Sequence, residues 1–230
     1  MDKLIKHYEA LWNQSLTGFE SGLFDVDPML DTNSDNRRGM SLVIKPPKHI
    51  YQQVMPLLDA LRMVEPDQYY YPSSDLHITV MPIISCYDGF EIKVIDLEKY
   101  ISAISDSILS IPKITFSGLT ASQACVMLRG YSENNSLDEF RNKLRRNFDK
   151  NGLVHSMDQR YRMVTAHSTI VRFKSRPKQV AKFLEVLNQF KHTEFGSFQV
   201  DKYELVYNDW YQKQANNEHL HTFNVSAVNE

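Results

Sequence analysis

Apolar residues recur along the chain with two periods, one typical of amphipathic helices and one typical of β-strands. The helical period predicts five helices, over residues 1–12, 49–63, 96–110, 137–150 and 178–190. Alternating or continuous apolar stretches predict strands over residues 39–47, 75–83, 113–121, 124–131 and 164–173, with closing strands in 197–209 and 219–228. The stretch 21–38 is rich in Asp, Asn and Ser and predicts a long loop, of the kind that often serves as a lid.

After residue 39 these elements follow the same order twice: strand, helix, strand, helix, strand. Leu42 and Val126, in the first strand of each repeat, are 84 residues apart, and His77 and His167, in the second, are 90 residues apart. We therefore expect a helix and loop extension over residues 1–39, packed on a single domain of residues 40–230. That domain would have two pseudo-symmetric lobes, about 40–122 and 123–230.

The second strand of each repeat carries a histidine two residues before a threonine. Side chains alternate across a strand, so His77 would stand beside Thr79, and His167 beside Thr169. By the same alternation, Phe173 would share the face of His167. Each histidine alone could be a core residue bonded to its own threonine. Two such pairs at equivalent places in two repeats favour a cleft that both pairs face.

Two histidines and two hydroxyls suit the chemistry of a phosphodiester. One neutral imidazole can take a proton from an attacking water while an imidazolium opposite protonates the leaving oxygen. An unperturbed pKa near 6.5 would let both forms exist near neutral pH. The hydroxyls of Thr79 and Thr169 can donate to the non-bridging oxygens, so this mechanism needs no metal and no cofactor.

Other catalytic patterns have less support. The sequence has no Gly-rich phosphate loop, no Cys/His cluster at zinc spacing and no serine elbow flanked by glycines. His219 and His221 could share a strand face and chelate a metal, but the sequence offers no third ligand.

Composition and charge narrow the class of partner. A net charge of −2 argues against binding of long duplex nucleic acid but allows a small anionic ligand in a local basic pocket. Cys86 and Cys125 lie in apolar surroundings, which favours two buried thiols over a disulfide. No apolar run is long enough to span a bilayer, and the stretch MDKLIKHYEALW is unlike a secretory signal. We expect a cytoplasmic monomer that does not bind membranes.

The stretches LHITV and HSTIVR, on strands in two repeats, resemble the two His-x-Thr motifs of the 2H phosphoesterase superfamily. This superfamily includes bacterial RNA 2′,3′-cyclic phosphodiesterases, also called 2′-5′ RNA ligases, and plant cyclic phosphodiesterases. The resemblance covers roughly residues 40–228 and implies a bilobal α+β fold, with two antiparallel-rich sheets flanking a central cleft. By position it makes His77 and His167 the acid/base pair, and Thr79 and Thr169 the phosphate donors.

Three further residues are candidates for substrate binding. Arg172 matches an arginine that follows the second motif in the RNA ligase-like branch, although strand alternation places it on the face opposite His167. Tyr71, in the run YYY, would offer a stacking face for a base or pack over the core. Phe173 completes the set through its place on the His167 face.

Basic residues outside the motifs are predicted to be solvated. They are Arg37 with Arg38, at a place where a lid would meet phosphate, and Arg141, Lys143, Arg145 and Arg146 on one helix.

The sequence thus predicts a metal-independent phosphoesterase acting on a 2′,3′-cyclic phosphate or a 2′-5′ phosphodiester of a nucleotide or short RNA. One alternative is a module that binds a nucleotide in the same cleft without turning it over. Another is an RNA-processing partner without pocket chemistry.

Overall fold

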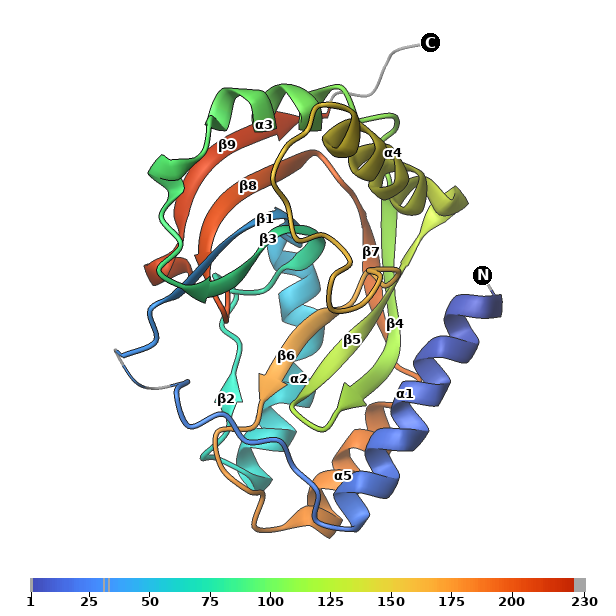
Figure 1. The fold of residues 1–230 in the computed structure, drawn as a ribbon. Coiled ribbons are helices and arrows are strands. Elements are labelled where there is room, and N and C mark those ends of the chain that lie inside the picture. Colours follow the sequence, from blue (N-terminus) through green and yellow to red (C-terminus); the bar gives the residue numbers. More distant parts are fainter. Residues whose placement is uncertain (1, 31, 33, 226–230) are drawn as a thin grey trace.

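Two antiparallel sheets form the centre of the molecule in a computed structural model, which describes residues 2–30, 32 and 34–225 (Figure 1). One sheet has the strand order β3-β1-β8-β9 and the other β2-β6-β5-β4-β7. The strands of the first sheet are β1 (Arg37–Ile44), β3 (Ile78–Asp88), β8 (Lys202–Asp209) and β9 (Glu218–Asn224). Those of the second are β2 (Tyr69–Tyr70), β4 (Lys113–Ser122), β5 (Cys125–Ser132), β6 (Ser168–Arg172) and β7 (Glu194–Gln199).

Helices cover the outer sides of the sheets. The α-helices of the described residues are α1 (Asp2–Glu20), α2 (Lys48–Val64), α3 (Leu97–Ser105), α4 (Ser136–Lys150) and α5 (Val180–Phe190). Helix α1 lies along β4, α2 contacts α5 and β7, and α3 pairs with α4 at the opposite end of the molecule (Figure 1). The predicted α+β class with two antiparallel sheets is confirmed.

The pseudo-symmetry of the two repeats is visible in the strand orders. The order β3-β1-β8 in one sheet corresponds to β6-β5-β4 in the other. Strand β4 comes from the first repeat but pairs with β5, and β8 comes from the second repeat but pairs with β1. The lobes are therefore not the contiguous halves 40–122 and 123–230, because the repeats exchange their closing strands.

This exchange also explains a break in the predicted strand 197–209. The stretch divides at Val200 and Asp201 into β7 and β8, which belong to different sheets. The backbone N–H of Val200 donates to the carbonyl of Pro112, and the carbonyl of Asp201 accepts from Val225. The last predicted strand, 219–228, ends in residues that lie outside the described ones.

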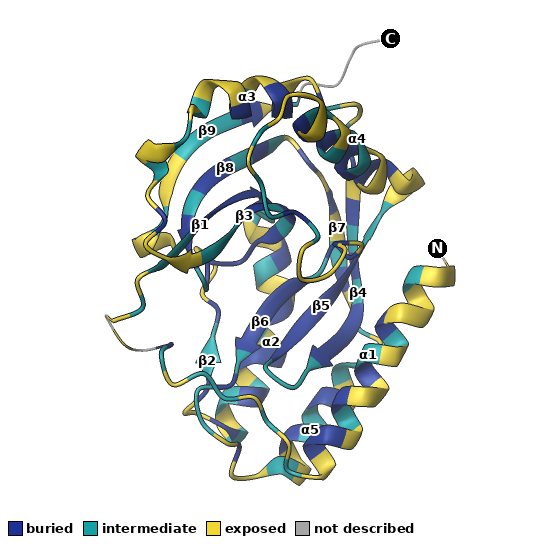
Figure 2. Ribbon diagram, viewed as in Figure 1, coloured by how far each residue is buried: buried dark blue, intermediate teal, exposed yellow. Residues whose placement is uncertain are grey.

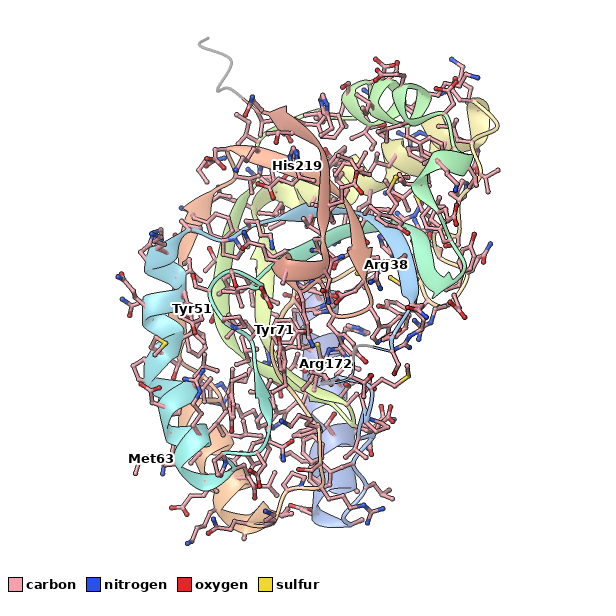
Figure 3. All side chains as sticks on the ribbon, turned by 90° about the vertical axis from the view of Figure 1, so that its left-hand side faces the viewer. Arg38, Tyr51, Met63, Tyr71, Arg172 and His219 are labelled. Atoms are coloured by element: carbon pink, nitrogen blue, oxygen red, sulfur yellow. The ribbon has the colours of Figure 1, made fainter. Side chains whose placement is uncertain are left out.

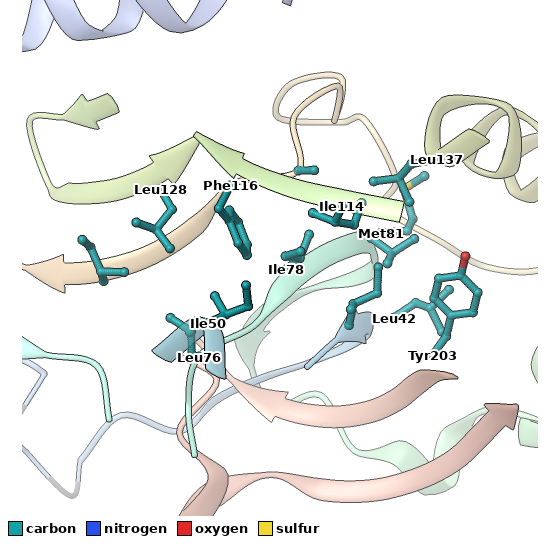
Figure 4. Close-up of a cluster of buried hydrophobic side chains, with 14 of the residues drawn as sticks. Leu42, Ile50, Leu76, Ile78, Met81, Ile114, Phe116, Leu128, Leu137 and Tyr203 are labelled. Carbon is teal, nitrogen blue, oxygen red and sulfur yellow. The ribbon is translucent and has the colours of Figure 1, made fainter. Parts of the chain in front are cut away.

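The main core lies between the two sheets (Figure 4). Leu42, Ile78 and Met81 of the first sheet meet Phe116 and Leu128 of the second, and all five side chains are buried. Buried residues follow the strands, whereas the outer faces of the helices are exposed (Figure 2). The strong period-2 and period-3.6 patterns of the sequence reflect this division.

A phenylalanine cluster attaches the N-terminal extension to the domain. Phe19 of α1 stacks on Phe24 at 4.8 Å between ring centroids, and Phe173 meets Phe24 edge-on at 5.1 Å. Phe183 of α5 also meets Phe173 edge-on, at 5.8 Å between ring centroids. Phe173 is 0% exposed, so its ring belongs to this cluster.

We predict that Phe173→Ala lowers the free energy of unfolding by about 3–5 kcal/mol, because it leaves a cavity between three aromatic rings. Urea denaturation followed by circular dichroism measures the change. Tyr87→Ala, at a side chain that is 52% exposed, is the matched control and should change stability little. A loss below about 1 kcal/mol for Phe173→Ala would contradict this role.

Candidate active site

The two His-x-Thr motifs meet at one cavity of about 180 Å³, which we call the central pocket. Its lining includes His77, Thr79, His167 and Thr169. Each histidine directly precedes its strand, since β3 begins at Ile78 and β6 at Ser168. The sequence prediction that both motifs face a shared cleft agrees with this arrangement.

A direct hydrogen bond joins the two motifs. The hydroxyl of Ser168 donates to the backbone carbonyl of His77 at 2.7 Å, and Ser168 is completely buried. The residue that follows the second histidine therefore fixes the backbone of the first.

Arg141 of α4 braces both motifs from behind. Its Nε donates to the carbonyl of Val80 at 2.8 Å, and its Nη2 donates to the carbonyls of Thr79 at 3.2 Å and Thr165 at 2.7 Å. The side chain is only 1% exposed, so the prediction that it is solvated is wrong. The sequence contained a signal for this: Arg141 lies four residues after Leu137 and three before Leu144, on the buried face of the helix.

The segment before His167 is also held closely. A Cβ added at Gly130 of β5 would lie 1.8 Å from the carbonyl oxygen of Ala166, so only glycine allows this approach. Arg145 holds the preceding loop through two bonds to the carboxylate of Asp158, at 2.6 and 3.0 Å. Arg145 is thus also a structural residue rather than a solvated one.

The two imidazoles have different hydrogen-bond partners. The Nδ1 of His77 lies 2.7 Å from the carbonyl of Asp75, which can only accept, so Nδ1 carries the proton and Nε2 is free to act as a base. The Nδ1 of His167 lies 2.6 Å from the hydroxyl of Thr165, which can either donate or accept. His167 can therefore bear a proton on Nε2 in its neutral form, or on both nitrogens as a cation.

Burial keeps both imidazoles neutral in the free protein. It lowers the pKa of His77 to about 3, although the bond to the Asp75 carbonyl opposes the shift. It lowers the pKa of His167 to about 4, and the positive charges of Arg141 and Arg172 add to the effect. Both pKa values are thus shifted down from the unperturbed value near 6.5 on which the sequence-based expectation rested.

Arg172 reaches the pocket because β6 contains a bulge. Thr169 pairs with Met127 and Val171 with Val126, so Ile170 is an extra residue that reverses the alternation. Arg172 consequently lies on the same face of β6 as Thr169 and lines the central pocket, whereas simple alternation would place it on the opposite face. The same reversal turns Phe173 away, and its predicted role in substrate binding is corrected to packing in the phenylalanine cluster.

Tyr71 holds Arg172 in place. Its hydroxyl accepts from the Nε of Arg172 at 3.0 Å and donates to the carbonyl of Tyr211 at 3.0 Å (Figure 3). The Tyr71 contact leaves Arg172 a cation, with a pKa raised above its usual value despite the desolvation. Tyr71 lines the pocket but is 1% exposed, so its ring offers little surface for stacking a base.

Sequence reasoning missed several lining residues that lie on loops. Trp210 follows β8, and Arg160 and Tyr161 belong to the loop before His167. The guanidinium of Arg37 lies 4.7 Å from the centre of the Trp210 ring, and that of Arg160 lies 4.8 Å from it. Arg37 also forms a 2.6 Å ion pair with Asp35, so it is a partnered residue at the cleft.

The described residues contain no group of three His, Cys, Asp or Glu side chains placed to hold a metal ion. His219 pairs with Val206 and His221 with Leu205, so a bulge in β9 puts the two histidines on opposite faces. The imagined two-histidine chelate is therefore not formed. Cys86 and Cys125 are free thiols rather than a disulfide, as predicted, but only Cys125 is buried and Cys86 is half-buried.

A family model described as the AKAP7 2′5′ RNA ligase-like domain matches residues 44–221. The chain belongs to this family. The family lies within the 2H phosphoesterase superfamily, so the resemblance inferred from the two motifs is confirmed.

Solved structures support the same fold for this AKAP7-type domain. A structure of TT0787 from Thermus thermophilus has 14% identity and a TM-score of 0.56, covering 81% of this chain and 97% of that one. A structure of E. coli LigT with 3′-AMP has 12% identity and a TM-score of 0.55, covering 83% and 99%. The search of curated proteins gave no significant match. Among the described residues, no helix has the length and apolar character needed to cross a membrane.

We predict that Arg141→Lys lowers the free energy of unfolding by about 1.5–3 kcal/mol, because one ammonium cannot reach all three carbonyls. Turnover of any substrate should fall mainly through kcat, since the two motifs would lose their relative position. Arg146→Lys, at an exposed position of the same helix, is the control. Normal stability and kcat in Arg141→Lys would show that the brace is dispensable.

The low pKa of His77 predicts a loss of stability in acid. In the unfolded chain this histidine binds a proton near pH 6.5, whereas in the folded chain it binds one only near pH 3. The stabilisation that neutral His77 gives the folded protein is therefore complete above pH 6.5 and is lost as the pH decreases towards 3. We expect His77→Asn to remove up to about 1.4 kcal/mol per pH unit of this slope. Urea titrations between pH 7 and 4 measure it, with His219→Asn as the exposed control. Equal slopes in wild type and His77→Asn would contradict the burial of a neutral His77.

Proposed function

We propose that this protein is a metal-independent phosphoesterase that hydrolyses a 2′,3′-cyclic phosphate or a 2′-5′ phosphodiester of a nucleotide or short RNA. The observation that carries the proposal is the convergence of both histidines, both threonines and Arg172 on one small pocket. Membership of the 2H superfamily supports a phosphoesterase, and the pocket supplies the groups that such a reaction needs.

The hydrogen bonds favour distinct roles for the two histidines. His77 is the general base, because its proton is held on Nδ1 and its free Nε2 can accept a proton from the attacking water. His167 is the general acid, because its partner Thr165 accommodates a protonated ring. In the reaction, the water oxygen bonds to phosphorus, its proton passes to His77, the bond to the ribose oxygen breaks, and His167 protonates that oxygen.

The anionic substrate would supply the negative charge that a protonated His167 needs beside it. A phosphodiester beside His167 would stabilise the imidazolium and raise its pKa from the low value of the empty pocket. Arg172 and the hydroxyls of Thr79 and Thr169 are placed to bind the non-bridging oxygens. Substrate binding would thus favour the protonated form of His167, which a general acid requires.

Structures of related fold give independent support for a phosphate ligand. E. coli LigT has been solved with 3′-AMP and with phosphate. A central pocket of about 180 Å³ in this chain suits a phosphodiester with part of its ribose.

The proposal is tested by the hydrolysis of nucleoside 2′,3′-cyclic phosphates and a 2′-5′-linked dinucleotide in the presence of EDTA. We expect wild-type turnover to persist, and His77→Ala and His167→Ala each to lose on the order of a hundredfold or more. His219→Ala, at an exposed histidine, should retain activity. Activity abolished by EDTA and restored by zinc would contradict the metal-free mechanism. Saturable nucleotide binding without turnover would favour a binding module instead.

The pH dependence checks the assignment of acid and base. Because kcat/KM reports the free protein and kcat the complex, the alkaline limb should lie at lower pH for kcat/KM than for kcat. The reason is that only bound phosphate raises the pKa of His167 above its value of about 4. Coincident alkaline limbs would show that the substrate does not stabilise the protonated acid.

A further inference from the structure

We propose that the N-terminal extension and the second sheet form a second nucleotide site, which holds the leaving nucleotide of a linear phosphodiester. This inference rests on the proposed function and selects, among its substrates, a linkage between two nucleotides. The site is a cavity of about 780 Å³ that we call the extension groove. Its walls include His7, Tyr8 and Leu11 of α1, Asp25–Asp27 of the following loop, and the β4–β5 hairpin.

The extension groove meets the central pocket on the side of His167 and not on the side of His77. Both cavities are lined by His167, Thr169 and Arg172, whereas His77 and Thr79 line the central pocket alone. The groove therefore leads away from the general acid. Because the acid protonates the leaving oxygen, the group that departs with that oxygen would lie in the groove.

Size separates the roles of the two cavities. The central pocket, at about 180 Å³, is below the usual range for a drug-sized ligand, whereas the extension groove lies within it. A cyclic phosphate has its leaving oxygen on the same ribose and would leave the groove empty. A linear diester would fill both cavities.

The lining has the chemistry of a nucleotide site. Arg160, Arg162 and Arg172 contribute positive charge, against the carboxylates of Asp25 and Asp27, whereas the charge of Arg37 is paired with Asp35. Asp27 accepts a hydrogen bond from the hydroxyl of Tyr211 at 2.9 Å, and three guanidinium groups outnumber the two carboxylates. A basic lining of this kind favours an anionic ligand.

An exposed aromatic ring lies at the junction of the two cavities. Tyr161 lines both of them and is 60% exposed, so its face is available for stacking a base. The indole of Trp210, in contrast, has a guanidinium 4.7 Å away from Arg37 and another 4.8 Å away from Arg160. We therefore assign base stacking to Tyr161 and phosphate attraction to Arg160, since the charge of Arg37 is already paired with Asp35.

The groove is held in shape by bonds between the extension and the sheet. Tyr8 donates to the carbonyl of Gly130 at 3.0 Å, Ser15 donates to that of Ala121 at 2.8 Å, and the N–H of Asp25 donates to that of Gln123 at 2.9 Å. The part of the wall that these bonds attach to the sheet, α1 and the loop that follows it, lies outside residues 44–221, which the family model matches. A wall fixed in this way lowers the entropic cost of binding.

Isothermal titration calorimetry tests the inference with two probes, a nucleoside 3′-monophosphate and a 2′-5′ dinucleotide whose phosphorothioate linkage resists cleavage. We expect wild type to bind the dinucleotide at least tenfold more tightly. Arg162→Glu should lower this preference at least fivefold, and Asp25→Lys, at an exposed groove residue, should increase it at least twofold. Arg146→Glu, at an exposed residue that lines neither cavity, should leave the preference unchanged.

Equal affinity for the two probes, or a preference that neither groove variant alters, would overturn the inference. If wild type nevertheless hydrolyses cyclic phosphates, the proposed function stands without the second site. A dinucleotide preference that responds to both variants, in a protein without turnover, would support the groove and contradict the proposed function.

Discussion

The candidate active site depends on holding together two motifs that lie on separate sheets. The hydroxyl of Ser168 bonds to the carbonyl of His77, and the guanidinium of Arg141 bonds to the carbonyls of Thr79, Val80 and Thr165. These bonds are buried, where water competes least and an unpaired donor is costly. They fix the backbone of both motifs, while the imidazoles remain free to face the pocket.

The same brace shapes the electrostatics of the site. A buried cation behind His167 and a second cation at Arg172 keep the pocket positive, although the chain as a whole has a net charge of −2. Asp158 also lines the pocket, but its carboxylate is already paired with Arg145 at 2.6 Å. An entering phosphodiester would supply the negative charge that a protonated His167 needs, so binding and proton transfer would be coupled through His167.

The sequence predicted the parts of this arrangement that follow from simple periodicity. Alternation and repeat order were sufficient to pair His77 with Thr79 and His167 with Thr169, and the resemblance of the two motifs to the 2H superfamily implied the fold class. They failed in β6, where the extra residue Ile170 reverses the alternation. Arg172 therefore lies on the pocket side of the strand and Phe173 on the other, the opposite of what alternation predicts. They failed also where a charged residue is buried, because Arg141 is satisfied by carbonyls from two distant segments that no local pattern reveals. The exchange of β4 and β8 is equally non-local, since each strand pairs according to the tertiary packing of both repeats.

The most direct test of the account is ¹⁵N NMR of the histidine side chains, titrated with and without a nucleoside 3′-monophosphate. We predict that free His77 is neutral at pH 7 with its proton on Nδ1, as the Asp75 carbonyl requires. We also predict that the ligand raises the pKa of His167 well above its free value of about 4. A His77 protonated on Nε2, or a His167 whose titration the ligand leaves unchanged, would contradict the claim that this pair works as base and acid on a phosphodiester.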